Sequence, residues 1–325
     1  MALSLHNPAT ESANRVVGRA PAWLDVEQKI QRASQTGRCT VLITGPQGTG
    51  KEVVARELHQ RSPRQAKPFT VVDCSTVSTE LLTSELFGHR RGSFTGADAN
   101  KAGLLASAEG GTAFLDEIGE LDLHTQARLL RFLQDHEVRQ VGSETYKPLD
   151  VRVVAATNRD LKSEIAAGRF RSDLYDRLNV VHICMPTLAE RREDIPLLID
   201  CFLRRYCELE KVQYEPLDED GIQMLMACKW TGNVRQLEKF IERYCVFGAN
   251  RRELQGLVRE EFGTDETPLS SVDTAPDNLD ELRRWKVAQV MAKVGNKKTA
   301  AALALGITRG TLERYLKEIA LTIPK

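Results

Sequence analysis

A glycine-rich segment stands between an apolar run at residues 39–44 and a helical pattern at residues 52–60. Its residues are Gly45, Pro46, Gln47, Gly48, Thr49, Gly50 and Lys51. Glycines let backbone N–H groups turn inward around phosphate oxygens, the following helix adds a favourable dipole, and the final lysine can reach the terminal phosphates. The segment predicts a binding site for the phosphates of ATP. Glu52 follows in place of Ser or Thr, so Mg²⁺ lacks a hydroxyl ligand and must depend on carboxylates and water.

Two acidic residues, Asp116 and Glu117, end the apolar run that begins at Thr112. Carboxylates at the carboxyl end of a parallel sheet lie beside a phosphate loop of this kind. We expect Asp116 to hold Mg²⁺, directly or through water, and Glu117 to orient and polarise the attacking water. Phosphoryl transfer needs mostly positioning and charge stabilisation, so these parts predict ATP hydrolysis. Without the phosphate loop, an Asp-Glu pair would usually be a solvated strand end.

The elements that must position these residues alternate between strands and helices over the first ~185 residues. Short apolar runs predict strands at residues 39–44, 69–73, 112–116, 151–156 and 180–184. The segments between them have helical patterns, of which residues 123–137 are the clearest. This order predicts an α/β domain with a mainly parallel sheet that is buried on both faces.

The strand patterns stop near Thr187, and helical patterns follow at residues 195–210, 219–228 and 234–247. A polar stretch with two prolines then predicts a linker. We therefore divide the chain into a short N-terminal segment, an α/β ATPase subdomain, a helical lid subdomain, a linker and a small all-α domain, at residues 1–15, 16–186, 187–263, 264–278 and 279–325.

The composition is that of an ordinary soluble protein, with 45 basic and 45 acidic residues and no net charge. The N-terminal residues have no signal-peptide pattern, and no apolar run approaches the ~20 residues that span a bilayer. The seven cysteines are odd in number and form no Cys-x-x-Cys pair, which favours small buried side chains in a reducing compartment over zinc ligands or disulfides. We expect a cytoplasmic protein without a membrane partner.

From about Val16 to Ala249 the chain resembles the central AAA+ domain of sigma-54-dependent transcriptional activators, the bacterial enhancer-binding proteins. Glutamate after the loop lysine is usual in that family. The most specific match is the segment from Glu85 to Ala97, whose last part corresponds at five of six positions to a loop that contacts sigma-54 in the family. These residues are Gly92, Ser93, Phe94, Thr95, Gly96 and Ala97, with serine in place of alanine at the second position. Taken alone, the segment would be an ordinary surface turn with one buried phenylalanine.

The resemblance also assigns roles to single residues in the ATPase and lid subdomains. Asn158 corresponds to the first sensor, near the terminal phosphate, and Arg235 to the second sensor, which reports nucleotide state to the lid. Arg171 and Arg177 lie in the family's arginine-finger segment and would reach into the neighbouring subunit's site. The family therefore implies ATP and Mg²⁺ as cofactors and a hexameric ring as the active homo-oligomer. The alternative for each arginine is a surface ion pair of little energetic value.

Asp73 stands where the family usually has an asparagine that holds the catalytic glutamate away from water. An amide can donate a hydrogen bond to a carboxylate, but an ionised aspartate cannot. Asp73 and Glu117 could share a proton or simply repel each other, so we expect an altered or pH-sensitive switch.

The C-terminal residues 279–325 carry ten basic and four acidic side chains, a surplus of six positive charges. This asymmetry is typical of a nucleic-acid-binding module. The segment resembles the Fis-type helix-turn-helix of the family, which implies upstream enhancer DNA as a partner. The residues near DNA would be Thr308, Arg309, Gly310, Thr311 and Arg314. The alternative is a helical hairpin used only for oligomerisation.

The favoured function is a ring ATPase that converts closed complexes of sigma-54 RNA polymerase holoenzyme into open ones. About fifteen residues precede Val16, so we expect no receiver or ligand-sensing domain, and control by synthesis level or by a regulatory protein acting in trans. One alternative is a DNA-binding repressor or sigma-70 regulator with a vestigial ATPase. Another is a ring ATPase of a different branch, such as a helicase loader or protein unfoldase.

Overall fold

The computed structural model describes residues 18–75, 79–93, 99–211, 215–247 and 250–263, together with Ala302 and Leu312. Several predictions of the sequence lie outside these residues. They are the N-terminal segment 1–15, the linker 264–278, the loop residues Phe94, Thr95, Gly96 and Ala97, and the DNA-reading residues Thr308, Arg309, Gly310, Thr311 and Arg314. The chain separates into two compact units, Met1–Thr267 and Pro268–Lys325, and the second is described only at Ala302 and Leu312, which are helical and buried.

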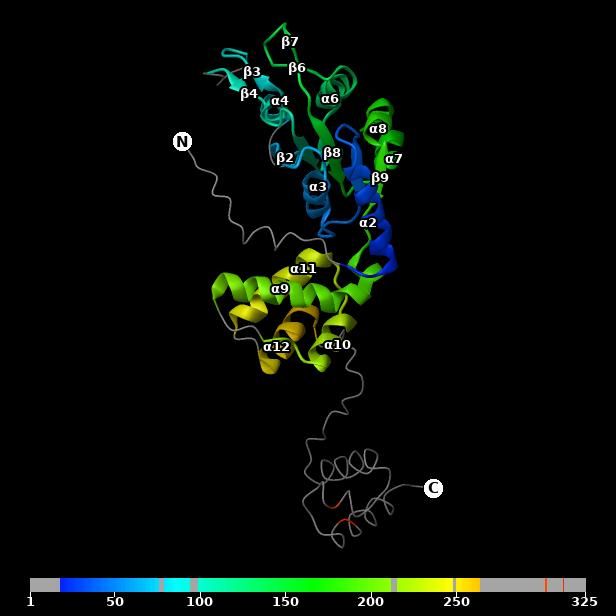
Figure 1. The fold of residues 1–325 in the computed structure, drawn as a ribbon, viewed down its shortest axis with the longest axis vertical. Coiled ribbons are helices and arrows are strands. Elements are labelled where there is room, and N and C mark those ends of the chain that lie inside the picture. The colour runs from blue at the N-terminus through cyan, green and yellow to red at the C-terminus, as the bar shows by residue number, and fades with distance from the viewer. Residues whose placement is uncertain are drawn as a thin grey trace. The chain divides into compact units, whose positions relative to one another are not determined.

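A five-stranded parallel sheet forms the centre of the first unit, in the order β2-β5-β8-β1-β9 (Figure 1). The strands are β1 (Val41–Thr44), β2 (Phe69–Asp73), β5 (Thr112–Asp116), β8 (Arg152–Thr157) and β9 (Val181–Cys184). The predicted α/β class with a mainly parallel sheet is confirmed.

Helices cover both faces of this sheet, because alternate residues of each strand are apolar on opposite sides. In β1, Val41 and Ile43 pack with α2 (Pro21–Ser34) and α3 (Lys51–Gln60), whereas Leu42 packs into the core on the other face. That second face is covered by α4 (Thr79–Phe87), α5 (Leu104–Ser107), α6 (Leu123–Asp135), α7 (Leu161–Ala166) and α8 (Ser172–Leu178).

Two small hairpins extend from the sheet subdomain. One pairs β3 (Gly88–His89) with β4 (Lys101–Ala102), and the other pairs β6 (Glu137–Arg139) with β7 (Tyr146–Pro148). The sequence predicted a helix through residue 137, but α6 ends at Asp135. His136 has a φ of 55°, a left-handed conformation that ends the helix and turns the chain into β6.

The lid subdomain is helical and has its own apolar core. It consists of α9 (Ile195–Glu210), α10 (Glu219–Ala227), α11 (Asn233–Val246) and α12 (Arg251–Phe262), and the 3₁₀ segment η2 (Leu188–Asp194) leads into it. A second 3₁₀ segment, η1 (Ile118–Glu120), follows β5 in the sheet subdomain. Trp230 packs edge-on against Phe240 and Phe262, with ring centroids 5.5 Å and 4.9 Å apart. This aromatic cluster fixes α11 against α12. Within the described residues, none of these helices is long and apolar enough to span a membrane.

Candidate active site

The phosphate loop leads from β1 into α3 and is shaped by glycines that adopt conformations other residues avoid. Gly48 has a φ of 78° and Gly50 a φ of 99°. A Cβ atom on Gly48 would lie 2.2 Å from the Gly232 carbonyl oxygen of the lid, so the loop and the lid meet too closely for any side chain there. The loop that the sequence predicted is therefore closed on one side by the lid.

Lys51 begins α3 and reaches back across the loop. Its side chain is 8% exposed, and Nζ donates a hydrogen bond to the Gly45 carbonyl at 3.0 Å. The same Nζ lies 3.5 Å from Oε1 of Glu117. Glu52, one position later, accepts a hydrogen bond from Arg56 at 2.9 Å on the half-exposed side of α3. The lysine is thus held in the site, whereas Glu52 sits at its rim.

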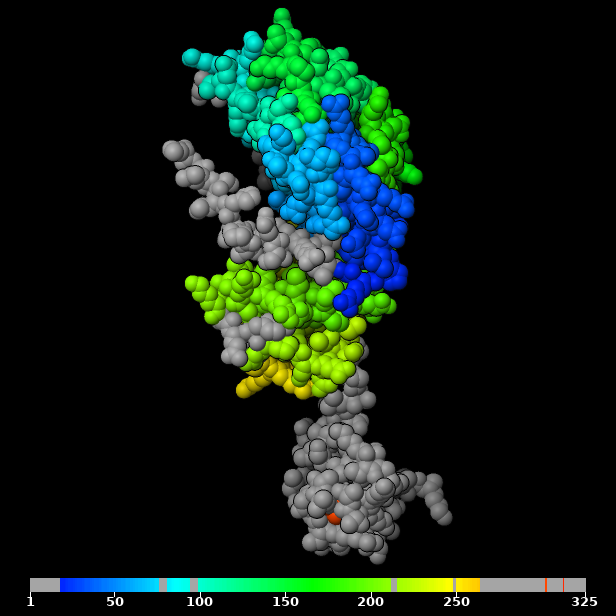
Figure 2. Space-filling model, in the orientation of Figure 1, coloured from blue at the N-terminus to red at the C-terminus, as the bar shows by residue number. Residues whose placement is uncertain are grey.

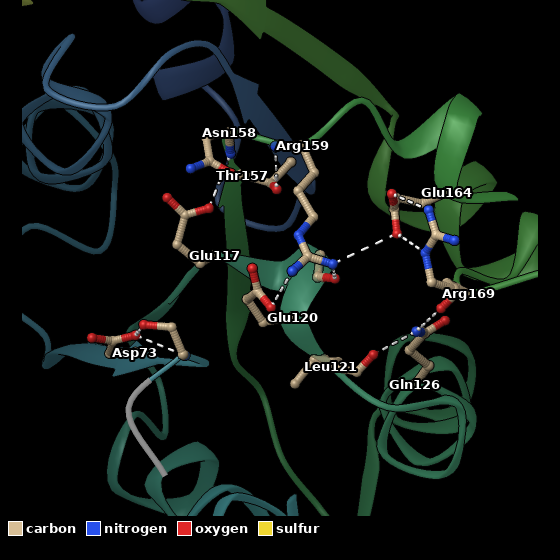
Figure 3. A network of polar contacts seen from close by, with 12 residues as sticks. Asp73, Glu117, Glu120, Leu121, Gln126, Thr157, Asn158, Arg159, Glu164 and Arg169 are labelled. Carbon is tan, nitrogen blue, oxygen red and sulfur yellow. Dashed lines mark hydrogen bonds and ion pairs between the residues drawn. The ribbon is translucent and has the colours of Figure 1, made fainter. Parts of the chain in front are cut away.

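Glu117 leaves the end of β5 with a φ of 51°, in the left-handed region that few non-glycine residues adopt. This conformation brings Oε2 within 3.0 Å of the Asn158 backbone nitrogen, which donates to it (Figure 3). Asn158 directly follows β8, the strand beside β5 in the sheet. Glu117 is therefore fixed between Asn158 on one side and Lys51 on the other.

Asp73 and Asp116 are register partners at the ends of β2 and β5. Oδ1 of Asp73 accepts hydrogen bonds from the Ser75 backbone nitrogen at 2.8 Å and from its hydroxyl at 2.6 Å. Burial raises the pKa of Asp116, and the negative charge of Glu117 raises it further. The charge of Asp73 raises this pKa by a smaller amount, whereas the positive charge of Lys51 lowers it. The carboxylates concentrate negative charge on one side of the loop.

The same carboxylates provide the oxygen ligands that Mg²⁺ prefers, and Mg²⁺ is usually held by one or two carboxylates plus phosphate oxygens. Asp116 fits that role by position and chemistry. The Thr49 hydroxyl, which is the one side-chain hydroxyl of the loop, donates to the Pro46 carbonyl at 2.8 Å. Among the described residues, no ready-made cluster of three or more metal-ligating side chains exists.

A pocket of about 430 Å³ brings most of the predicted site residues together. It is lined by Gln47, Gly48, Thr49, Gly50, Lys51, Glu52, Asp73, Asp116, Glu117 and Arg235 from the predicted set. Gly45 and Pro46 belong to the same loop, and the Asn158 backbone nitrogen donates to Glu117. Further lining residues come from the lid and from α2.

The lid is tied to the phosphate loop by direct hydrogen bonds. The Arg235 backbone nitrogen donates to the Gly48 carbonyl at 3.1 Å. Asn233, 3% exposed with a φ of 55°, donates from Nδ2 to the Gln47 carbonyl at 2.9 Å and accepts from the Leu188 nitrogen at 2.9 Å. Sequence reasoning missed Asn233, although the Gly232-Asn233 pair before a helical pattern is a turn signal that could have drawn attention to it.

Arg191 is a second residue that the sequence did not reveal. It is 4% exposed, donates from Nη2 to the Thr49 carbonyl at 3.0 Å, and lies over the Trp23 ring with 4.6 Å to the centroid. Burial lowers the pKa of Arg191 to about 10, and Asp194 opposes that shift. Asp194 in turn accepts from the backbone nitrogens of Arg19 and Ala20 at 2.6 Å and 2.9 Å. The start of α2, the lid entrance and the phosphate loop are thus joined at one buried point.

With this geometry, comparisons with known proteins identify the family. A model of the sigma-54 interaction domain matches residues 16–184, and a model of the AAA+ ATPase lid domain matches residues 189–255. The chain is 43% identical over 304 residues to the transcriptional regulatory protein ZraR of Escherichia coli K12, covering 93% of this chain and 68% of ZraR. The chain belongs to the sigma-54-dependent transcriptional activators.

Two further relatives agree with this assignment. The response regulator protein PilR of Pseudomonas aeruginosa is 38% identical over 328 residues, which cover 98% of this chain and 74% of PilR. The crystal structure of NtrX from Brucella abortus in complex with ADP superposes with a TM-score of 0.71 at 34% identity, covering 96% of this chain and 71% of NtrX. This sigma-54-dependent activator is therefore an ATPase with an AAA+ fold and a nucleotide-binding pocket.

The two predicted arginine fingers of the activator do not line the pocket of their own chain. Arg171 precedes α8 and pairs with Asp173, with Nη2 2.7 Å from Oδ2, and this pairing raises the pKa of Arg171. Arg177 lies in the last turn of α8 and is exposed, and its side chain has no hydrogen bond or ion pair with any other described residue. Arg171 therefore forms the kind of surface ion pair that is the alternative to an arginine finger, whereas Arg177 forms none with the described residues.

A network of polar contacts connects the Glu117 side of the site with the arginine-finger segment (Figure 3). Arg159 follows Asn158 and contacts Glu120, the Gly119 carbonyl and Glu164. Glu164 also pairs with Arg169 at 2.7 Å. Gln126 closes the network, because its amide donates to the carbonyls of Leu121 and Arg169 while its Oε1 accepts from the Arg171 nitrogen at 2.9 Å.

Proposed function

We propose that this activator hydrolyses Mg²⁺-bound ATP in the pocket and uses the reaction to convert closed sigma-54 RNA polymerase complexes into open ones. The observation that carries the chemistry is the placement of Glu117 between the Asn158 nitrogen and Lys51, at the edge of the phosphate loop. A carboxylate fixed in this way can orient water for in-line attack on the terminal phosphate. Lys51 and the backbone N–H groups of the loop bind the phosphates.

Asp116 would hold Mg²⁺ with phosphate oxygens and water, and the metal would neutralise charge that develops on the phosphates. Arg235 lies in the first turn of α11, and its backbone nitrogen donates to the Gly48 carbonyl, so a change at the phosphates would reach the lid through this contact. Asp73 remains a proposed switch residue. Its bonds to Ser75 hold its carboxylate at the end of β2, beside Asp116.

The active form in this proposal is a hexameric ring. Arg171 and Arg177 would complete the neighbouring subunit's site, which agrees with their absence from the lining of their own pocket. The residues Gly92 to Ala97 would contact sigma-54. Residues 279–325 would bind upstream enhancer DNA through a helix-turn-helix, after a linker at 264–278, and the protein would act in the cytoplasm. These assignments rest on the family resemblance of the matching residues and on the charge surplus of the C-terminal segment.

The experiment tests promoter opening separately from hydrolysis. The purified chain would be mixed with ATP, sigma-54 holoenzyme and a sigma-54 promoter, at concentrations high enough for assembly without enhancer DNA. Open complexes and ATPase activity would be measured for the wild type, Thr95→Ala and the control Thr36→Ala, which changes a threonine outside the pocket and the loop. We expect the wild type and the control to open the promoter, and Thr95→Ala to hydrolyse ATP without opening it. An assembled, ATP-hydrolysing wild type that never opens the promoter would contradict the proposal.

A further inference from the structure

A second hollow lies between α6 and the β6–β7 hairpin and has a volume of about 280 Å³. We name it the arginine cavity, after Arg128, Arg131 and Arg139, which surround Tyr146. The remaining lining residues are Phe87, His124, Glu137, Gln140, Val141 and Gly142. None of these residues takes part in the nucleotide pocket.

The three guanidinium groups of the cavity form no ion pair with any acidic residue that the structure describes. Within the described part of the chain, no carboxylate lies within ion-pair distance of any of them, and Glu137 is the only acidic residue among those that line the cavity. Arg131 donates to the Tyr146 hydroxyl at 2.7 Å, Arg139 donates to the Ser143 carbonyl at 2.7 Å, and Arg128 donates to the Arg139 carbonyl. The guanidiniums are thus positioned by neutral groups, and no described carboxylate is paired with them.

This concentration of positive charge affects the groups inside the cavity. Burial lowers the pKa of Arg128, and the neighbouring charge of Arg139 lowers it further. The hydrogen bond from Arg139 is the largest of the causes that lower the pKa of the Tyr146 phenol. Like charges held together in a partly enclosed space repel each other, and an anion that enters relieves the repulsion. Arginine forks are suited to a carboxylate or phosphate because they donate two parallel hydrogen bonds.

The cavity adjoins the start of the Gly92–Ala97 loop. Val141, which lines it, donates to the Gly88 carbonyl at 2.8 Å and accepts from the Arg90 nitrogen at 3.0 Å. A Cβ atom on Gly142 would lie 2.7 Å from Cβ of Ser93. In Figure 2 the cyan surface of β3 and β4 meets the green surface of β6 and β7 at the same end of the subdomain. A polypeptide held by the loop would therefore pass beside the cavity.

We propose that the arginine cavity binds aspartate or glutamate side chains of the same sigma-54 polypeptide that the Gly92–Ala97 loop contacts. The proposal rests on the proposed function, because it needs sigma-54 at the loop. A protein carboxylate fits better than nucleic acid. The aromatic faces that could stack bases are covered by guanidiniums, with Arg128 4.7 Å from the Phe87 centroid and Arg131 and Arg139 5.7 Å and 5.8 Å from that of Tyr146.

The test measures binding of the assembled full chain, with ADP and aluminium fluoride, to sigma-54 free of DNA. The variant Arg131→Gln/Arg139→Gln removes two charges from the cavity, and its matched control Arg38→Gln/Arg252→Gln removes two exposed charges elsewhere. We expect the Kd for sigma-54 to rise about 10- to 100-fold in the cavity variant and to stay within about twofold in the control, since charged hydrogen bonds are lost only in the first. Arg131→Lys/Arg139→Lys, which keeps the charge, should recover part of the affinity.

Three further measurements separate the outcomes. Arg131→Gln alone covers the case in which the double variant unfolds, because the Tyr146 hydroxyl is the one hydrogen-bond partner of the Arg131 side chain among the described residues. Equal affinities of the cavity variant and its control, with binding still weakened by Phe94→Ala, would overturn the cavity proposal and leave the proposed function standing. Loss of affinity for promoter DNA instead of sigma-54 would overturn it in favour of a phosphate site. A wild type that binds no sigma-54 would contradict both.

Discussion

The nucleotide pocket and the arginine cavity both gather cationic side chains, but only the pocket balances them with acids. In the pocket, Lys51 lies 3.5 Å from Glu117, and Arg205 pairs with Glu238. In the cavity, Arg128, Arg131 and Arg139 have only neutral hydrogen-bond partners among the described residues. A pocket with both acidic and basic side chains suits Mg²⁺-bound ATP, whose cation meets the acids and whose phosphates meet the lysine. The cavity, where three arginines outnumber the one lining carboxylate of Glu137, suits an anion that arrives without a cation.

The two regions also differ in how firmly they are anchored. The pocket is held by buried contacts between distant parts of the chain, such as Asn233 with Gln47 and Arg191 with Thr49. The hairpin beside the cavity is mostly exposed, and β7 is exposed at every residue. The pocket therefore depends on contacts between distant parts of the chain, whereas the hairpin leaves its side chains open to a partner.

The largest expected effect comes from Glu117→Gln, which alters the pocket and leaves the cavity untouched. Without the carboxylate that orients water, we expect ATP hydrolysis to fall about 10²- to 10⁴-fold while ATP still binds. ATPase rates and ATP binding of the purified variant, beside the control Glu144→Gln on the exposed hairpin, measure this. Hydrolysis within tenfold of the wild type would show that another group orients the water.

A smaller effect is expected from Asn233→Ala, which tests whether the lid anchors the pocket. Two buried hydrogen bonds are lost, to the Gln47 carbonyl and from the Leu188 nitrogen, so unfolding should become easier by about 1–3 kcal/mol and ATP affinity should drop. The control is Asn250→Ala, which removes the N-cap of α12 and costs about 1 kcal/mol without touching the loop. Thermal unfolding and ATP titrations compare the two variants. An equal loss of ATP affinity in both would mean that the Asn233 contacts have no special role.

Asp73→Asn removes one negative charge from the pocket, and we expect it to change how ATP hydrolysis depends on pH. Protonation of Asp116 removes its ability to hold Mg²⁺, and its raised pKa makes activity fall at a higher pH than an ordinary aspartate would allow. Removing the charge of Asp73 removes one cause of that rise, so the acid limb of the ATPase–pH profile should move to lower pH. Basal rates from pH 6 to 8 that match the wild type would contradict a switch role for Asp73.

The smallest effect is expected from Ser93→Ala, beside the cavity. The Ser93 hydroxyl is buried and has no hydrogen-bond partner among the described residues, so its removal should leave stability unchanged or raise it by at most about 1 kcal/mol. Thermal unfolding of the variant measures this. A marked destabilisation would reveal a hydrogen bond of Ser93 to a part of the chain that the structure does not describe.

The strands and the phosphate loop were predictable because their signals are local. Apolar runs buried on both faces end sharply, so strand β5 begins and ends at the predicted residues, 112 and 116. The hairpin strands β3, β4, β6 and β7 are two or three residues long and mostly polar, so they leave no periodicity to detect.

The residues that join lid and loop could not be found in the same way. Arg191 and Thr49 are 142 positions apart in the chain, and Asn233 and Gln47 are 186 apart. Neither pair follows a spacing that a helix or strand imposes, because the contacts form only when the lid folds back onto the sheet. Asp116 and Glu117 were found because the carboxyl ends of parallel strands always meet the loop.

The most direct test of the central claim asks whether hydrolysis in this pocket opens the promoter. Open complexes on a sigma-54 promoter would be counted with the wild type and ATP, with the wild type and a non-hydrolysable ATP analogue, and with Glu117→Gln and ATP. We predict open complexes only in the first case, although nucleotide binds in all three. Promoter opening of similar extent with the analogue or with Glu117→Gln would contradict the account.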